Sequence, residues 1–514
     1  MSAETGSGSE IGSPGAPGSS GAVSFTSVLK HAGIYGLGNV GIRVAGLLLV
    51  PLYTYNLSPA EYGIIEYLDL TAMAIGMLFS LGLANAIYRF YYLEPEEDRR
   101  RVVSTALVPV LVISFLVSAL LLLGAPWIAG AIFHDARFVR YLRLLFLGFG
   151  FNMVAEFGMT YLAVRQRSAR FSAITVAKFV LGALLNVLFL VVWHRGVEGI
   201  LISNLITNTA TGVLLLIAVV RENGLAYDGS LLRRMVAYGY PLVLVQVALF
   251  AINFADRFFL QATAGFTQVG IYALAYKFGI MLNTLVVASF FQVWNAKSFE
   301  VAADPGAAPF YSRVFTYFTA GLLVAWLGMS LVIRDVIALV APPSYSPAAF
   351  LVPLILAAYV ANGIGTYFEL GLKLSNRTPL LGAIFAGTCV LCLGLYALLI
   401  PRYGMLGAVL ATLVAFLVKA VWIYRVSLRS ISIRYEFGRL LVAALAAVAI
   451  WGARSLVPPL PRVPSIAVDL AFFAVYPALL WATGWVRAEE RGALTAWLRR
   501  GSTGLRAAGV SEAK

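Results

Sequence analysis

The chain has 514 residues, of which 60% are hydrophobic and only 12% are charged. Soluble domains carry about 25% charged residues, so this composition excludes a water-soluble protein and favours one that crosses a membrane many times. The formal net charge of +14 does not indicate nucleic-acid binding, because the basic residues lie in short segments between apolar stretches, where they set membrane orientation.

The first 26 residues are rich in Gly, Ser and Pro and contain too few apolar residues to bury a core. They predict a disordered tail on the cytoplasmic side. The tail has no basic start followed by an apolar run and a cleavage site, so it is not expected to be a signal peptide.

Apolar stretches of about 20 residues, the length that an α-helix needs to cross a bilayer, follow one another along the rest of the chain. They predict an all-α membrane protein with about fourteen transmembrane helices. The expected spans are 31–55, 64–88, 102–125, 141–163, 171–193, 197–220, 235–259, 269–294, 312–340, 348–371, 378–400, 404–425, 436–457 and 466–486.

Basic residues are distributed unevenly between the two sets of loops. With the N-terminus inside, and with residues near a span end counted in the adjoining loop, 25 of the 38 Lys and Arg residues fall on the inner side and 9 on the outer side, and four lie deeper within spans. Because Lys and Arg accumulate in cytoplasmic loops, both termini are predicted to be cytoplasmic.

Short patterns recur at a nearly constant distance. Gly196-Val-Glu-Gly199 and Gly404-Met-Leu-Gly407 lie 208 residues apart, and Tyr35-Gly36 and Tyr238-Gly239 lie 203 apart. They predict two parallel copies of a six-helix unit, with a binding site between them. The expected division is a tail at 1–26, an N-lobe at 27–222, a C-lobe at 232–428, two added helices at 435–487 and a cytoplasmic tail at 488–514.

Three segments resemble a known family: LSPAEYG at 57–63, DRFFL at 256–260 and GIYALAYK at 270–277. The similarity extends over about residues 27–430. The segments are similar to those of the polysaccharide transporter family of the multidrug/oligosaccharidyl-lipid/polysaccharide exporter superfamily. That family includes the flippases for O-antigen and exopolysaccharide repeat units.

The resemblance implies two six-helix lobes around a central cavity and transport by alternating access. The implied cargo is a lipid-linked oligosaccharide, typically carried on undecaprenyl pyrophosphate and turned from the cytoplasmic to the outer face of the bacterial cytoplasmic membrane. Membrane lipids, a driving H⁺ or Na⁺ ion and a polysaccharide polymerase complex are the other partners that we expect.

Four spans carry a basic residue away from the span ends, and such a residue costs about 2.5–3.5 kcal/mol at mid-bilayer on insertion scales. We expect such groups to line a polar cavity and to bind a pyrophosphate head group, since ammonium and guanidinium groups replace the hydration that it loses. Ion pairing of Lys178 with Glu156 is the alternative, and Lys419 could instead reach the cytoplasmic surface. The predicted head-group and sugar-binding residues are Arg43, Lys178, Lys277, Lys419, Tyr35, Asn39, Asn186 and Tyr276.

Three acidic residues within spans, Glu156, Asp256 and Glu369, are candidates for coupling transport to H⁺ or Na⁺, since burial favours the protonated form of a carboxyl group. For Asp256 the alternative is a simple ion pair with the adjacent Arg257. Glu66 and Asp69 are expected near the membrane surface, at the start of their span.

Polar residues also recur at helical spacing, as in Asn152, Glu156 and Thr160 of one span and Asn204, Asn208 and Thr211 of another. Each such set predicts a narrow polar stripe. A single amide or hydroxyl in a membrane helix commonly serves as a contact to a neighbouring helix, worth about 0.6 kcal/mol, so a stripe by itself does not define a site.

The sequence contains no HExxH, GxSxG or GxxxxGK[ST] motif and no long soluble region, so we expect neither an enzyme nor a bound metal or cofactor. Two alternatives to a flippase stay open. One is a drug/cation antiporter of the same superfamily, which would favour acidic residues in the N-lobe. The other is a non-transporting component of an envelope polysaccharide assembly complex.

Overall fold

The computed structural model describes residues 46, 49–429, 433–458, 461–485 and 487. The described part contains helices and no strands, and eleven of its helices are long and apolar enough to cross a membrane. The all-α membrane class is therefore confirmed. The predicted span 31–55 lies largely outside the described residues, as do the two tails at 1–26 and 488–514.

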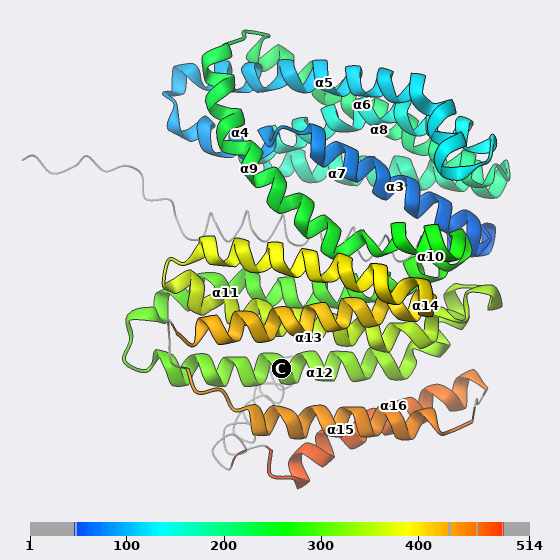
Figure 1. The fold of residues 1–514 in the computed structure, drawn as a ribbon, viewed down its shortest axis with the longest axis vertical. Helices are drawn as coiled ribbons and strands as arrows, with labels where there is room; N and C mark the ends of the chain where they lie inside the picture. The colour runs from blue at the N-terminus through cyan, green and yellow to red at the C-terminus, as the bar shows by residue number, and fades with distance from the viewer. Residues whose placement is uncertain (1–45, 47–48, 430–432, 459–460, 486, 488–514) are drawn as a thin grey trace, which may run out of the picture.

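The helices form two bundles and an added pair (Figure 1). The first bundle contains α3 (Pro59–Phe79), α4 (Leu83–Leu93), α5 (Arg99–Ile128), α6 (Arg137–Val164), α7 (Ser168–Asn186) and α8 (Gly196–Asn223). The second contains α10 (Asp256–Leu282), α11 (Ser289–Glu300), α12 (Ala307–Val340), α13 (Ala348–Leu374) and α14 (Thr378–Ser427). The added pair is α15 (Phe437–Ser455) and α16 (Arg462–Ala482), and the short α2 (Val50–Asn56) precedes α3.

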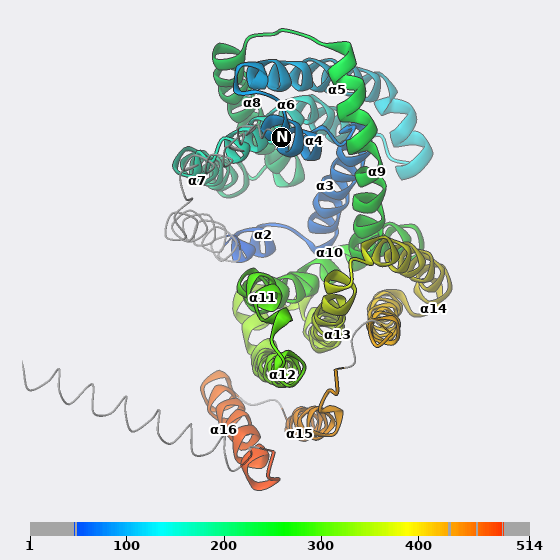
Figure 2. The same ribbon diagram turned by 90° about the vertical axis from the view of Figure 1, so that its left-hand side faces the viewer.

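Helix α9 (Gly229–Phe254) crosses from one bundle to the other (Figure 1). It contacts α4 and α5 of the first bundle and α14 of the second. The pair α15–α16 packs on α12, on the side of the second bundle that faces away from the first (Figure 2).

Matching backbone features confirm that the two bundles are parallel copies of one unit. Gln166 has a φ of +54° and Asn376 a φ of +55°, each just after a long helix. Gly196 has a φ of +54° at the start of α8, and Gly404 has a φ of +55° at the kink that divides α14 into two helical segments. Left-handed residues are rare outside turns, so their recurrence in the same order marks equivalent positions.

The structure differs from the expected spans where glycine interrupts a helix. The stretch predicted as one span, 64–88, breaks into α3 and α4 at Leu81 and Gly82, which have φ of +51° and +67°. A side chain at Gly82 would lie 2.2 Å from the Gly239 oxygen of α9, so the break lets the two backbones touch. Gly265, with φ +78°, kinks α10 between the expected spans 235–259 and 269–294, in agreement with them, and a Cβ there would meet nothing within 4 Å.

The two bundles meet where α3 and α10 cross. A Cβ at Gly63 would lie 2.0 Å from the Phe266 oxygen, and one at Gly270 would lie 1.9 Å from the Pro59 oxygen. Only glycine permits this backbone-to-backbone approach, so both glycines of the segments LSPAEYG and GIYALAYK have a structural role at the junction.

Candidate functional site

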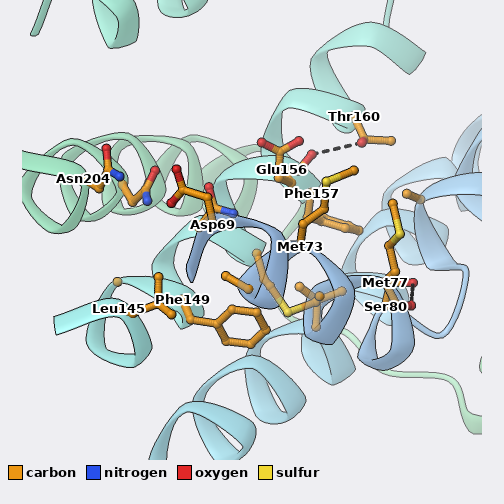
Figure 3. A pocket seen from close by; sticks show the side chains of 18 of the residues that line it. Asp69, Met73, Met77, Ser80, Leu145, Phe149, Glu156, Phe157, Thr160 and Asn204 are labelled. Atoms are coloured by element: carbon orange, nitrogen blue, oxygen red, sulfur yellow. Dashed lines mark hydrogen bonds between the residues drawn. The ribbon is translucent and has the colours of Figure 1, made fainter. Parts of the chain in front are cut away.

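A cavity of about 640 Å³ lies within the first bundle, between α3, α6 and α8. Figure 3 shows that Asp69 of α3, Glu156 of α6 and Asn204 of α8 reach into the same space. Met73, Phe149 and Phe157 form apolar parts of the wall. The cavity therefore has the mixed lining that is typical of a site for a small polar group with specific orientation.

The polar lining of this cavity is acidic and amide-rich. Among the described residues that line it, Asp69 and Glu156 are charged and none is Lys, Arg or His. The amide side chains that line the cavity are Asn85, Asn152, Asn204, Asn208 and Gln246. Carboxylates accept hydrogen bonds and attract cations, whereas amides both donate and accept, so this lining can bind a cation or the hydroxyl groups of a sugar.

Three of the polar groups lie on one face of α6, as their spacing in the sequence predicts. Asn152, Glu156 and Thr160 follow one another at intervals of four residues along α6 and all line the cavity. Thr160 donates its hydroxyl to the Glu156 carbonyl oxygen at 2.9 Å, a bond within the helix. The Glu156 side chain is exposed to the cavity, and no ion pair holds its carboxylate among the described residues.

Asp69 lies further along its helix than the sequence indicates, because α3 begins earlier than expected. Ser58 and Glu61 form a capping box that starts the helix at Pro59. Asp69 is therefore ten residues along α3, about 15 Å from its start at 1.5 Å per residue. That depth puts its carboxylate in the cavity wall.

Lys178 of α7 lies beside this cavity, in a smaller pocket of about 360 Å³ that Glu156 also lines. No ion pair within 4.0 Å joins these two described residues. The structure thus brings the base and the acid to the same pocket without pairing them.

The second bundle contains a pocket of about 350 Å³, lined by Lys419 and Glu369 among others. Lys419 is buried, donates to the Asn362 side-chain oxygen and lies 5.0 Å from the Phe416 ring centroid. Glu369 pairs with Lys373, one turn further along α13, at 3.0 Å. In this pocket the ammonium of Lys419 is thus bonded to the Asn362 amide, and the carboxylate of Glu369 is already paired with Lys373.

Asp256 and Arg257 form a buried pair at the junction of the bundles. The guanidinium of Arg257 lies 2.7 Å from Asp256 and 3.6 Å from Glu66 of α3, and Tyr272 donates its hydroxyl to Asp256. Tyr276 lies beneath the same guanidinium, with its ring centroid at 4.1 Å. The ion pair expected as the alternative role of Asp256 is present, and it joins the two bundles through Glu66.

Other predicted site residues lie apart from the first-bundle cavity. The ammonium of Lys277 lies 5.5 Å from the centroid of the Tyr62 ring. Asn186 is buried and donates to the hydroxyl of Tyr53 at 2.8 Å. Arg43, Tyr35 and Asn39 lie outside the described residues.

Sequence reasoning missed Asn85 and underestimated Asp69. Asn85 lies on α4, just after the break at Gly82, so no continuous helical spacing connects it with α3. An amide that follows a helix break marked by glycine is the sequence signal that could have identified it.

The described residues include no group of three or more His, Cys, Asp or Glu that could hold a metal ion.

Solved structures with this fold are transporters. The lipid II flippase MurJ, in an inward closed conformation, superposes with a TM-score of 0.70 at 11% identity, covering 87% of this chain and 99% of that protein. A multidrug resistance transporter of the MATE family, in an inward-facing conformation, gives a TM-score of 0.58 at 15% identity over 76% of this chain and 97% of that one. The chain therefore has the fold of MOP-superfamily transporters.

Sequence comparison gives the family. Lsg locus putative protein 1 of Haemophilus influenzae is 22% identical over 290 residues, which are 53% of this chain and 68% of that protein. The profile of the family described as polysaccharide biosynthesis protein matches residues 28–294, which is more than half of the chain. The chain therefore belongs to the polysaccharide biosynthesis protein family.

Proposed function

We propose that this protein is a flippase that carries a lipid-linked oligosaccharide from the cytoplasmic to the outer face of the bacterial cytoplasmic membrane. The single observation that carries the proposal is a cavity of about 640 Å³, lined in part by carboxyl and amide groups, inside a MOP-type bundle in a chain of the polysaccharide biosynthesis family. A transported glycan needs such a cavity because its hydroxyl groups lose their hydrogen bonds to water inside the membrane.

The contacts between the bundles support an inward-facing state. The bundles touch at Gly63 and Gly270, near the start of α3, whereas the cavity extends from Asp69 toward Asn85, at the other end. With both termini in the cytoplasm, the closed end is the outer one. The cavity would then receive cargo from the cytoplasmic side.

Within this proposal, the amides and the two carboxylates of the cavity contact the sugars. Lys178, in the adjoining pocket, meets the pyrophosphate, and the polyprenyl tail of an undecaprenyl carrier stays in the lipid. Glu156 is the first candidate for H⁺ or Na⁺ coupling, because it is exposed to the cavity and unpaired among the described residues, whereas Asp256 and Glu369 are paired. Catalysis is not part of the proposal.

A deletion strain tests the proposal. Loss of the gene should cause a lipid-linked oligosaccharide to accumulate, and mass spectrometry of the extracted lipids would identify its glycan and carrier. Expression of the chain should remove the intermediate and restore surface polysaccharide. A deletion strain with a normal lipid pool and normal surface polysaccharide would contradict the proposal and would favour a different role in the envelope.

One observation favours a second candidate, a drug/cation antiporter of the same superfamily. Asp69 and Glu156 give the first-bundle cavity an acidic lining with no Lys or Arg among its described residues, and carboxylates attract cationic drugs. The discriminating experiment is efflux of a cationic dye from cells that express the chain. Efflux above the vector control, without any change in the lipid-linked pool of the deletion strain, would select the antiporter.

A further inference from the structure

A groove of about 740 Å³ lies far from the candidate site, where α12, α13 and α15 come together. Its lining comes from the last three turns of α12, from residues 342–353 around the start of α13, from the end of α15, and from Tyr55 of α2. Because all of these segments are helix ends or helix starts, the groove lies at one face of the membrane. Figure 2 shows that α12 and α15 lie on the side of the molecule away from the first bundle.

The walls of the groove are mostly apolar. Aliphatic and aromatic side chains from three helices form them, with Pro353 at the start of α13. Apolar walls at a membrane face are suited to the upper part of an acyl chain rather than to a water-soluble ligand. The main wall residues are Leu331, Ile337, Phe350, Pro353 and Trp451.

Two arginines reach this groove, and they differ in their partners. Arg454 is buried and bonded to Asp469 and to Ser465, so its charge is already compensated. Arg334 is exposed, and among the described residues no carboxylate lies within 4.0 Å of its guanidinium. An arginine without a protein partner at the mouth of an apolar groove is complementary to a phosphate, which the planar guanidinium can bind through two hydrogen bonds.

A second polar group lies deeper in the same groove. Ser330 is only 4% exposed, and its hydroxyl has no hydrogen-bond partner in the described part of the chain. It precedes Arg334 by four residues, so both lie on one face of α12, about 6 Å apart along the axis. A buried hydroxyl without a partner is costly, which indicates that a ligand satisfies it.

We propose that this groove binds an anionic phospholipid of the surrounding membrane. The phosphate lies at Arg334, an ester carbonyl accepts the hydrogen bond of the Ser330 hydroxyl, and the acyl chains lie along the apolar wall. A free phosphate would leave the wall and the deeper hydroxyl without a role. A zwitterionic lipid also has a phosphate, but its ammonium group lies beside that phosphate and is repelled by Arg334. With both termini cytoplasmic, the lipid belongs to the outer leaflet. The site is independent of transport, so it goes beyond the proposed function.

Native mass spectrometry of the full chain in detergent tests the proposal. The probes are phosphatidylglycerol and phosphatidylcholine with identical acyl chains, at equal concentration. The wild type should retain phosphatidylglycerol about fivefold better, the factor that corresponds to about 1 kcal/mol for one basic residue at a membrane surface. Arg334→Gln should abolish this preference, and Ser330→Ala should weaken retention of both lipids without removing the preference.

Two further variants serve as controls, one for the position of the arginine and one for its charge. Arg313→Gln removes an exposed arginine from the other end of the same helix and should leave the preference unchanged. Arg334→Lys keeps the charge and should keep most of the preference, which separates a loss of charge from a loss of fold. An unchanged preference in Arg334→Gln, or an equal loss in Arg313→Gln, would overturn the proposal. Displacement of phosphatidylglycerol by an equimolar undecaprenyl phosphate would overturn it too, because the groove would then belong to the cargo.

Discussion

Two kinds of acidic residue lie within the membrane-spanning helices, and their surroundings separate them. Asp256 is fully buried, pairs with Arg257 at 2.7 Å and accepts a hydrogen bond from Tyr272. Glu156 faces a cavity and has no ion-pair partner among the described residues. The first arrangement stabilises the junction of the bundles, whereas the second leaves a carboxylate free to bind an ion or a sugar.

Asp256→Asn should destabilise the protein, because the change leaves the Arg257 guanidinium buried without its nearest anion. Removing one partner of a buried ion pair typically costs about 3–5 kcal/mol. Thermal unfolding of the purified chain in detergent would show a clearly lowered midpoint. Glu300→Gln is the control: it breaks the exposed pair with Lys297, at 2.8 Å, which should matter little. Equal midpoints for the two variants would contradict the structural role of Asp256.

Glu156→Gln should leave folding unchanged, because the side chain keeps its size and loses no ion-pair partner. If Glu156 couples transport to an ion, the variant should no longer respond to an imposed pH or Na⁺ gradient in reconstituted vesicles. Glu94→Gln, which removes the exposed pair with Arg234, is the matched control and should respond like the wild type. A gradient response that survives in Glu156→Gln would exclude this residue as the coupling group.

How far the sequence predicts the site depends on whether a residue belongs to an unbroken helix. The stripes of α6 and α8 could be predicted, because spacing of four residues puts Asn152 with Glu156 and Asn204 with Asn208 on a single face. Which face meets a cavity depends on neighbouring helices, and spacing carries no information on that. The contact of Arg257 with Glu66 joins helices almost 200 residues apart and could not be predicted either.

At the scale of helices, glycine decides where the bundles touch. Gly63 of α3 and Gly270 of α10 face each other's backbone, and Gly82 faces Gly239 of α9 in the same way. The sequence marks the first two glycines by family resemblance, but it does not show that they pack against each other. That knowledge requires the arrangement of the two bundles.

Gly63→Ala should force α3 and α10 apart, because the new Cβ would lie 2.0 Å from the Phe266 oxygen. Backbone atoms cannot yield as a flexible side chain can, so the closed end should open. Spin labels at the exposed positions Ala136, just before α6 of the first bundle, and Thr267 of α10, with Cys389 and Cys392 replaced, would report the distance across this end.

The control for that experiment is Gly321→Ala on α12, where a Cβ would meet nothing within 4 Å. It should leave the label distance as in the wild type. The account of the junction fails if Gly63→Ala gives the same distance distribution as Gly321→Ala.

At the scale of the whole molecule, two parallel copies of one helical unit enclose separate pockets of different chemistry. The first-bundle cavity has Asp69 and Glu156, and the second-bundle pocket has Lys419 bonded to Asn362. Composition and repeat spacing were sufficient to predict the class and the duplication. They could not predict this asymmetry, because equivalent positions of the two copies hold different residues.

Loop charge predicts that both ends of the chain are cytoplasmic. An enzyme reporter fused after Lys514 that is active only in the cytoplasm should be active, and one that is active only outside should be silent. The opposite pattern would invert the topology and would turn the closed end of the bundles, at Gly63 and Gly270, toward the cytoplasm.

The central claim is that this chain moves a lipid-linked oligosaccharide across a membrane, and reconstituted vesicles test it most directly. Vesicles that contain the purified chain and a lipid-linked oligosaccharide are treated with a glycosidase that cannot cross the bilayer. If the chain is a flippase, glycans of the inner leaflet become accessible and are cleaved, whereas those in protein-free vesicles stay protected. Glycans that stay protected to the same extent with and without the protein would contradict it.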